Sequence, residues 1–212
     1  MIYYKLPLVM KIKFSKAHGT QNTFVIIYNN DNHQLIKNNI QKICNQFNTD
    51  GLLIVSDHMQ YDYKMDYFNN DGTWETMCAN GARCVALFMW KQKKCNKNIN
   101  FLAGDGVHKI KINNEDNISL SMIKPLFKTE EIKPNGYKGR FIDSGAKHFV
   151  TKINSSIKIN RLKEKGQEIR YNKIFPNGTN VNFMQLINNN HIKVWTYEKG
   201  IENMVMSCGS GS

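Results

Sequence analysis

Apolar residues recur along most of the chain in short runs separated by turn-forming residues. Residues 23–28 and 52–55 are continuous apolar runs of strand length, and residues 117–123 alternate between polar and apolar positions. Residues 100–112 and 181–197 each hold two such runs around a Gly- or Asn-rich centre, which predicts two hairpins. The pattern therefore predicts a chain built mainly of strands.

One segment follows the period of a helix instead. Residues 34–47 place apolar side chains at helical spacing, which predicts an amphipathic helix. A further helix is expected to begin at Cys78, where a cysteine precedes a glycine-bearing turn in the stretch MCANGARC at 77–84. This mixture of elements predicts an α+β fold.

The two halves of the chain repeat one order of elements. A strand, a turn, a second strand and a loop lead to Cys78-Ala-Asn-Gly81 in the first half and to Cys208-Gly-Ser-Gly211 in the second. A repeat of this length is too long for a solenoid and predicts a duplicated domain. By this symmetry, the two cysteines would occupy equivalent places and could face each other across a cleft.

The domain boundary is expected between residues 127 and 128, which gives domains 1–127 and 128–212. The polar stretch 124–138 holds two of the four prolines and is the predicted linker. Residues 1–9 are expected to be a disordered extension, because Met10 is a second candidate start.

Composition sets the class of protein. A chain of 212 residues that is 41% hydrophobic can bury a real core, and it has no apolar run of membrane-spanning length and no secretory signal. Five cysteines is an odd number, which argues against a disulfide framework and for reduced thiols. We therefore expect a cytoplasmic protein that does not bind a membrane.

The formal net charge of +12 allows two interpretations. A basic surface can neutralise the phosphates of a nucleic acid. The lysines are scattered, however, and only the cluster at 91–94 is dense, so we predict no nucleic-acid partner. The charge also suits an anionic small molecule. A homodimer stays open, because the sequence does not fix the oligomeric state.

Cys78 and Cys208 are the candidate chemical groups. A thiol at a helix N-terminus is favoured as the thiolate, and the N–H groups there also bind a carboxylate. Two such ends can share the α-carboxylate of an amino acid, with one sulfur on each side of its α-carbon. One thiolate could then remove the α-proton while the other thiol returns a proton, which inverts the centre without a cofactor.

A cysteine can also be a core residue, a metal ligand or a protease nucleophile. Cys44, Cys84 and Cys95 fit the small core residues that most cysteines are. A metal site is not predicted, because no CxxC motif or His pair accompanies Cys78 and Cys84. Cysteine-protease chemistry would need a positioned His, and His148 is available, but no matching nucleophile signature is present.

Several motifs in one order resemble the diaminopimelate epimerase family, a family of cofactor-independent amino-acid epimerases. The resemblance implies two pseudo-symmetric domains, each a curled β-sheet around a central helix, with the site in the cleft between them. It implies epimerisation of LL-2,6-diaminopimelate to meso-diaminopimelate without pyridoxal phosphate. The motifs that carry it are KAHGTQNTF at 16–24, DGLLIV at 50–55, YFNNDG at 67–72, MCANGARC at 77–84, DSGAKH at 143–148, NVNF at 180–183, TYEKG at 196–200 and SCGSG at 207–211.

The resemblance also assigns roles to residues of this chain. Cys78 and Cys208 match the acid/base pair, and His148 and Glu198 match the polar residues that set protonation beside the thiols. The remaining matches are substrate-binding positions, namely the backbone around Ala79, Asn80, Gly209 and Ser210 for the α-carboxylate, the side chains of Asn22, Asn69 and Asn180, and Lys199 near the distal end of the substrate.

Three departures from the family pattern bear on function. Lys199 stands where the family has an arginine, and Ala146 where it has an asparagine, so distal recognition is expected to differ. A related racemase of another amino acid, such as histidine, is therefore an alternative. Family members also continue beyond the second cysteine motif, so we expect a truncated chain with an incomplete second domain. A catalytically impaired fragment that only binds an amino acid is the second alternative.

Overall fold

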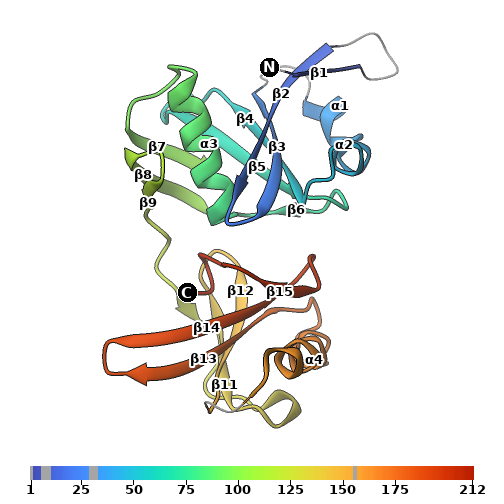
Figure 1. Ribbon diagram of the computed structural model, residues 1–212, viewed down its shortest axis with the longest axis vertical. Coiled ribbons are helices and arrows are strands. Elements are labelled where there is room, and N and C mark those ends of the chain that lie inside the picture. Colours follow the sequence, from blue (N-terminus) through green and yellow to red (C-terminus); the bar gives the residue numbers. More distant parts are fainter. Residues whose placement is uncertain (1, 6–10, 29–32, 155–156) are drawn as a thin grey trace. The chain divides into compact units, whose positions relative to one another are not determined.

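Two sheets, one in each half of the chain, carry the fold (Figure 1). The computed structural model describes residues 2–5, 11–28, 33–154 and 157–212. The chain divides into two compact units, Met1–Ile123 and Lys124–Ser212. The break falls ahead of the predicted boundary at 127/128, because Leu126 and Phe127 already pair with Asp143 and Ile142 in the second sheet.

In the described residues, the first unit contains a nine-stranded sheet and three helices. The strand order is β1-β2-β3-β4-β5-β7-β8-β9, with β6 paired to β5. The strands are β1 (Ile2–Lys5), β2 (Lys11–Gly19), β3 (Asn22–Tyr28), β4 (Gly51–Ser56), β5 (Tyr63–Asn69), β6 (Trp74–Glu75), β7 (Asn98–Ala103), β8 (Gly106–Asn114) and β9 (Asn117–Leu120), and the helices are α1 (His33–Lys37), α2 (Ile40–Phe47) and α3 (Ala79–Lys91).

This sheet is covered on both faces. Phe24 and Ile26 pack into the cluster that holds α3, whereas the alternating Val25 and Ile27 pack into the cluster that holds α2. Successive side chains of a strand point to opposite faces, so a strand covered on both faces reads as a continuous apolar run. Residues 24–27 are therefore all apolar because a helix lies against each side of β3.

The second unit has a six-stranded sheet and one long helix among its described residues. The elements are β10 (Leu126–Phe127), η1 (Pro134–Gly136), β11 (Gly139–Asp143), β12 (Lys147–Lys152), α4 (Ile159–Arg170), β13 (Asn180–Asn188), β14 (His191–Glu198) and β15 (Asn203–Val205). Val181 and Phe183 belong to the core cluster that includes Leu162 of α4. Asn180 and Asn182 alternate with them and therefore point to the opposite face.

The predicted α+β class and both predicted hairpins, β7–β8 and β13–β14, are confirmed. Three details differ. The expected helix over 34–47 is two helices, α1 and α2, separated by Asn38 and Asn39, two residues of low helix propensity. Residues 124–138 are part of the second unit rather than a free linker. Ile2–Lys5 form a strand on β2 instead of a disordered segment, and the rest of 1–9, with Met10, lies outside the described residues.

Candidate active site

Cys78 is the N-cap of α3, with the extended backbone of a cap residue (φ −134°, ψ 113°). Its sulfur accepts the Gly81 N–H at 3.4 Å, so one of the four unpaired donors at the helix start is directed at the thiol. Gly81 lies close to the sheet, since a Cβ there would come within 3.0 Å of the Leu53 side chain. The small residues after Cys78 therefore let the helix start lie tightly on the sheet.

Asn22 supplies the second contact to Cys78. The Cys78 thiol donates to Asn22 Oδ1 at 3.7 Å, while Asn22 Nδ2 donates to Asp50 Oδ2 at 3.3 Å. The same carboxylate oxygen accepts from the Thr23 backbone N–H at 2.7 Å and from the Thr23 hydroxyl at 2.9 Å. Asp50 thus fixes the Asn22 amide with its oxygen toward the sulfur. Asp50 is the first residue of the motif DGLLIV, but the resemblance assigns it no role at the site.

The other predicted residues of the first unit lie at the same end of the sheet. Asn69 is buried, accepts from the Tyr67 hydroxyl at 2.7 Å and donates to Thr73 Oγ1 at 3.1 Å. Asn69 closes the turn after β5. The next residue, Asn70, donates its backbone N–H to the Asp50 carbonyl. Ala79 is buried and Asn80 is half-buried, and both belong to the first turn of α3. Asn80 also lies against Gly19, where an added Cβ would meet it at 3.2 Å.

Cys208 lies in the turn that ends the second unit. Its sulfur is 3.5 Å from Ser210 Oγ, with the backbone N–H groups of Ser210 and Gly211 close by. Burial and the nearby Glu198 charge raise the pKa of the Cys208 thiol to about 11, and the hydrogen bonds from Ser210 and Gly211 oppose that rise. Burial therefore favours the thiol form of Cys208.

His148 joins Cys208 through Ser210. The imidazole is 1% exposed, with Nδ1 2.7 Å from Asn182 Oδ1 and Nε2 3.0 Å from Ser210 Oγ. Burial lowers the pKa of His148, although the Asn182 hydrogen bond and the charge of Asp143 act against it. The ring is accordingly neutral near pH 7.

The remaining predicted residues of the second unit hold its strand ends together. Asn180 donates to the Lys147 carbonyl at 3.0 Å and accepts the Lys199 backbone N–H at 2.8 Å. Glu198 precedes Lys199 at the end of β14 and acts on Cys208 through its charge. Gly209 and Ser210 form the turn after Cys208, and the Ser210 carbonyl accepts the Ser144 hydroxyl at 2.5 Å.

The predicted site residues therefore fall into two groups, one in each unit. Asn22, Asn69, Ala79 and Asn80 gather at Cys78, while His148, Glu198, Gly209 and Ser210 gather at Cys208 with Asn180 and Lys199 near by. Asp50 and Asn182 were missed as positioning residues. Asp50 begins the motif DGLLIV and Asn182 lies in the motif NVNF. In each motif a polar residue stands next to buried apolar ones, and this is the sequence signal that could have identified it.

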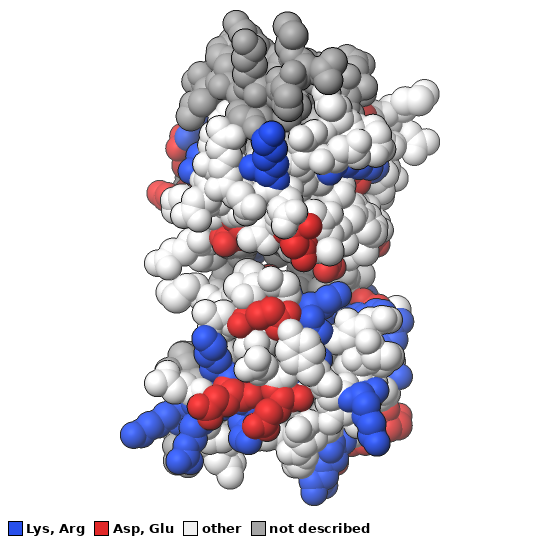
Figure 2. Space-filling view, turned by 90° about the vertical axis from the view of Figure 1, so that its right-hand side faces the viewer, with Lys and Arg blue, Asp and Glu red and all other residues white. Residues whose placement is uncertain are grey.

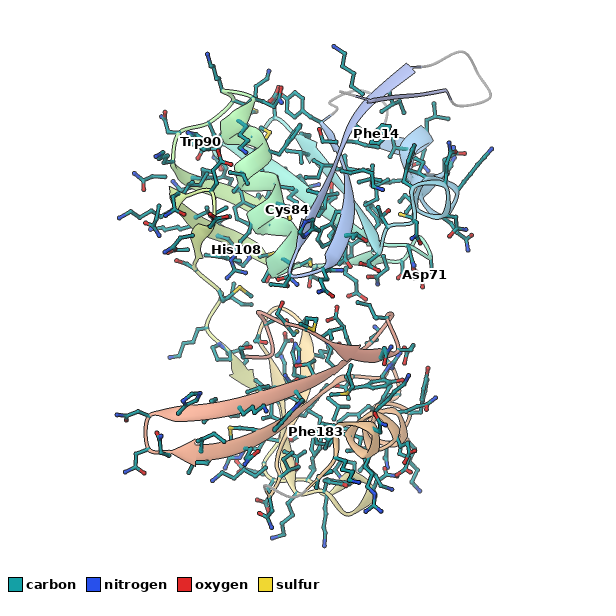
Figure 3. All side chains as sticks on the ribbon, viewed as in Figure 1. Phe14, Asp71, Cys84, Trp90, His108 and Phe183 are labelled. Carbon is teal, nitrogen blue, oxygen red and sulfur yellow. The ribbon has the colours of Figure 1, made fainter. Side chains whose placement is uncertain are left out.

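The other cysteines are structural. Cys44 and Cys84 are buried in the two clusters of the first unit, as predicted. Figure 3 labels Cys84, and burial raises the pKa of its thiol to about 11. Within the described ranges, His, Cys, Asp and Glu side chains form no group of three suited to a metal ion. No helix in that part of the chain is long and apolar enough to cross a membrane. On the face in Figure 2, Lys and Arg lie among Asp and Glu.

Known proteins resemble the chain at the level of sequence. A family model described as diaminopimelate epimerase matches residues 14–127. Diaminopimelate epimerase of Campylobacter jejuni strain RM1221 is 33% identical over 205 residues, which span 94% of this chain and 78% of that protein. The enzyme of the same name from Flavobacterium psychrophilum is 34% identical over 211 residues, covering 95% and 78%.

Solved structures share the fold at low identity. A hydroxyproline epimerase from Agrobacterium vitis aligns with a TM-score of 0.74 at 10% identity, over 94% of this chain and 74% of that one. A PhzF-family phenazine biosynthesis protein from Bacillus anthracis aligns with a TM-score of 0.64 at 13% identity, over 93% and 75%. The sequence relatives and the shared fold together show that the chain belongs to the diaminopimelate epimerase family of amino-acid epimerases.

Proposed function

We propose that this chain inverts the α-carbon of an amino acid, converting LL-2,6-diaminopimelate to meso-diaminopimelate, with Cys78 and Cys208 as the acid/base pair. One observation carries the proposal. In both units the backbone N–H of the glycine three residues after the cysteine acts on the sulfur: the Gly81 N–H donates to Cys78 at 3.4 Å, and the Gly211 N–H lowers the pKa of the Cys208 thiol. Each unit therefore presents a thiol in the same main-chain setting, as a reaction with one sulfur on each face of a carbon requires.

The surroundings of each sulfur suit both protonation states. A backbone N–H stabilises a thiolate, while Asn22 Oδ1 accepts from the Cys78 thiol and the Glu198 charge favours the Cys208 thiol. In the reaction, one thiolate takes the α-proton, forming an S–H bond and leaving the electron pair on the α-carbon. The opposite thiol then gives its proton to that carbon, and the configuration is inverted.

The α-carboxylate is proposed to bind the backbone N–H groups around Ala79, Asn80, Gly209 and Ser210. Such groups stabilise the negative charge that spreads onto the carboxylate as the α-proton leaves. The side chains of Asn22, Asn69 and Asn180 would contact the substrate. All chemistry would then come from side chains and backbone, without a cofactor.

A second candidate is a racemase of another amino acid, such as histidine. The observation behind it is Lys199, which stands where the resemblance expects an arginine. Lysine offers a point charge and cannot match a carboxylate with two parallel hydrogen bonds. The distal carboxylate of diaminopimelate would therefore be held less firmly than in other family members.

Exchange of the α-proton tests both candidates. The reduced protein in D2O should remove the α-proton signal of LL-diaminopimelate from the ¹H NMR spectrum and produce the meso isomer. L-histidine and L-lysine serve as comparison substrates, because lysine lacks the distal carboxylate. Exchange with histidine alone would favour the second candidate. A folded, reduced sample that exchanges none of them but shows ligand-dependent thermal shifts would indicate a binding protein.

The cytoplasm is the proposed compartment. All five cysteines are free thiols, which suits a reducing environment. Free thiols are also what the proposed reaction needs, since oxidation of either sulfur would remove the acid/base group.

A further inference from the structure

The hydrogen bonds around His148 determine which ring nitrogen carries its proton. Asn182 Nδ2 donates to the Gly211 carbonyl at 2.8 Å and to Thr196 Oγ1 at 2.9 Å, and a carbonyl can only accept. The amide oxygen of Asn182 must therefore be the atom that faces His148. Since an amide oxygen is also only an acceptor, the proton of the neutral imidazole lies on Nδ1.

This tautomer leaves Nε2 as a bare acceptor 3.0 Å from Ser210 Oγ. The Ser210 hydroxyl has a single proton, so it donates that proton to Nε2 and accepts from the Cys208 thiol at 3.5 Å. The Ser144 hydroxyl holds the Ser210 carbonyl at 2.5 Å and keeps this residue in place. The hydrogen bonds therefore form one chain in which each group donates to the next: the Cys208 thiol to the Ser210 hydroxyl, that hydroxyl to His148 Nε2, and His148 Nδ1–H to Asn182 Oδ1.

We propose that the Ser210 hydroxyl relays a proton between the Cys208 thiol and His148, and that Asn182 positions His148 for this relay. In the forward step, the Cys208 S–H bond breaks and its proton binds Ser210 Oγ. The original Ser210 hydroxyl proton passes to His148 Nε2, so a thiol and a neutral imidazole become a thiolate and an imidazolium. The reverse step restores the thiol.

The relay complements the proposed acid/base role of Cys208, on which this inference rests. Glu198 on β14 and Asp143 on β11 are the charged groups that act on Cys208 and His148 respectively. Glu198 disfavours the thiolate, and Asp143 favours the imidazolium. The thiolate and the imidazolium that the relay forms attract each other, and this attraction offsets part of the cost of burying the charged sulfur.

Alkylation of Cys208 tests the relay without any substrate. The full chain is treated with iodoacetamide across pH 6 to 10, and modification of the Cys208 peptide is followed by mass spectrometry. We expect Ser210→Ala to slow alkylation near pH 8 by roughly three- to tenfold, because each pH unit by which ionisation moves changes the thiolate fraction tenfold. Ser210→Thr keeps a hydroxyl and should restore the rate.

Two comparisons make this test specific. Ser212→Ala removes a hydroxyl that donates to the Cys208 carbonyl at 2.8 Å rather than to the sulfur, and it should leave the rate unchanged. Cys78 of the same molecule should keep its rate in every variant, because its partners Asn22 and Gly81 are untouched. Thermal melting of each variant shows whether it is folded.

A double variant decides whether His148 acts through Ser210. His148→Gln should slow alkylation as Ser210→Ala does, and the double variant should be no slower than the slower single one, since both changes interrupt one path. Effects that add, or a Ser210→Ala rate equal to that of the unmodified chain, would overturn the relay. α-Proton exchange is measured separately, so its absence alongside the expected alkylation pattern would overturn the proposed function and leave the relay standing.

Discussion

Cys78 and Cys208 each begin the pattern Cys-x-x-Gly, but the two units hold them differently. Behind Cys78 lies α3, a helix of 13 residues with seven of them buried, so the thiol stands on an element fixed by the first core. Behind Cys208 lies a turn of residues 208–212, fixed by hydrogen bonds with the side chains of Ser144, His148 and Asn182.

The difference shows that one local motif can be supported by packing or by a polar network. Apolar contacts spread support for α3 over many residues, so one small change is shared among them. A buried polar network concentrates support in a few hydrogen bonds, and breaking one leaves its partners unsatisfied. We call each thiol with its hydrogen-bond partners a half-site of the proposed active site. The second half-site, at Cys208, is therefore expected to be the more fragile one, although the proposed reaction needs both thiols.

The largest expected effect is loss of either thiol, which tests whether the two half-sites are equivalent in chemistry. Cys78→Ala and Cys208→Ala should each reduce epimerisation of LL-diaminopimelate by about 10²- to 10⁴-fold, the usual contribution of an acid/base group. Interconversion of the two isomers, followed by chiral chromatography, measures it. Cys95→Ala is the matched control and should keep the rate. A variant of Cys78 or Cys208 that also kept it would refute the paired mechanism.

Second in size is the contrast between the two motif glycines, which tests packing against a polar network directly. A Cβ at Gly211 would lie 2.3 Å from Asn182 Nδ2 and 3.0 Å from His148 Cε1, both in the buried network. We expect Gly211→Ala to destabilise the second unit by about 3 kcal/mol, the upper range for overpacking, and to separate Asn182 from the Gly211 carbonyl.

Gly81→Ala is its partner experiment. There the added Cβ would meet only the end of the Leu53 side chain, at 3.0 Å, and alanine favours a helix over glycine by about 1 kcal/mol. The change in unfolding free energy should therefore stay within about 1 kcal/mol of zero. Urea denaturation of the two variants measures both values. Equal losses at Gly81 and Gly211 would mean that the two half-sites are supported alike.

The sequence could predict what depends on local pattern. The apolar run at 23–28, the hairpin around Gly104 and Gly106 and the helix start at Cys78 all follow from short-range periodicity and turn chemistry. The Asn38-Asn39 break in the expected 34–47 helix was missed, because the spacing of the apolar residues continues across it. The spacing of apolar positions alone does not reveal a helix break at the polar residues between them.

The sequence names the candidate site residues, but it does not reveal how they are connected. Asn22 and Asp50 meet because Phe24 of β3 pairs with Gly51 of β4, a parallel register that no local pattern reveals. Asn182 meets His148 in the same way, since His148 pairs with Asn180 across β12 and β13. In a chain rich in asparagine, only strand register distinguishes the asparagine that orients a histidine from one in a turn.

Third in size is the effect of Asp50, the polar support in the first half-site. Asp50→Asn removes the charge that accepts from Asn22 and Thr23, and a hydrogen bond to a charged group contributes about 1.5 kcal/mol or more. We expect a loss of about 1.5 kcal/mol in unfolding free energy together with altered alkylation of Cys78, because Asn22 can then turn its amide. Asp71→Asn, in the nearby exposed turn, is the control. Unchanged Cys78 alkylation would show that packing alone holds the first half-site.

The smallest expected effect concerns two histidines, one in each unit, that are equally buried at 1% exposure. Burial alone would lower the pKa of His108, but its hydrogen bonds to Asp105 (2.8 Å) and to the Ser121 carbonyl (3.0 Å) and the Asp105 charge raise it overall. Both partners of the His108 ring are hydrogen-bond acceptors, which favours its doubly protonated form. His148 has one acceptor, Asn182, and one hydroxyl, and its pKa is lowered.

These opposite shifts predict opposite pH dependence. A raised pKa adds stability that is complete below about pH 6.5, the unfolded value, and is lost as the pH rises through the folded pKa. A lowered pKa adds stability that is complete above about pH 6.5 and is lost as the pH falls toward the folded pKa. His108→Gln should therefore cost more unfolding free energy at pH 5.5 than at pH 8, and His148→Gln more at pH 8 than at pH 5.5. NMR titration of the two imidazole Cε1–H signals is the independent measurement. If the His148 ring titrated above pH 6.5, its hydrogen bond and the Asp143 charge would outweigh burial there, and the neutral acceptor that the relay requires at His148 would lose its physical basis.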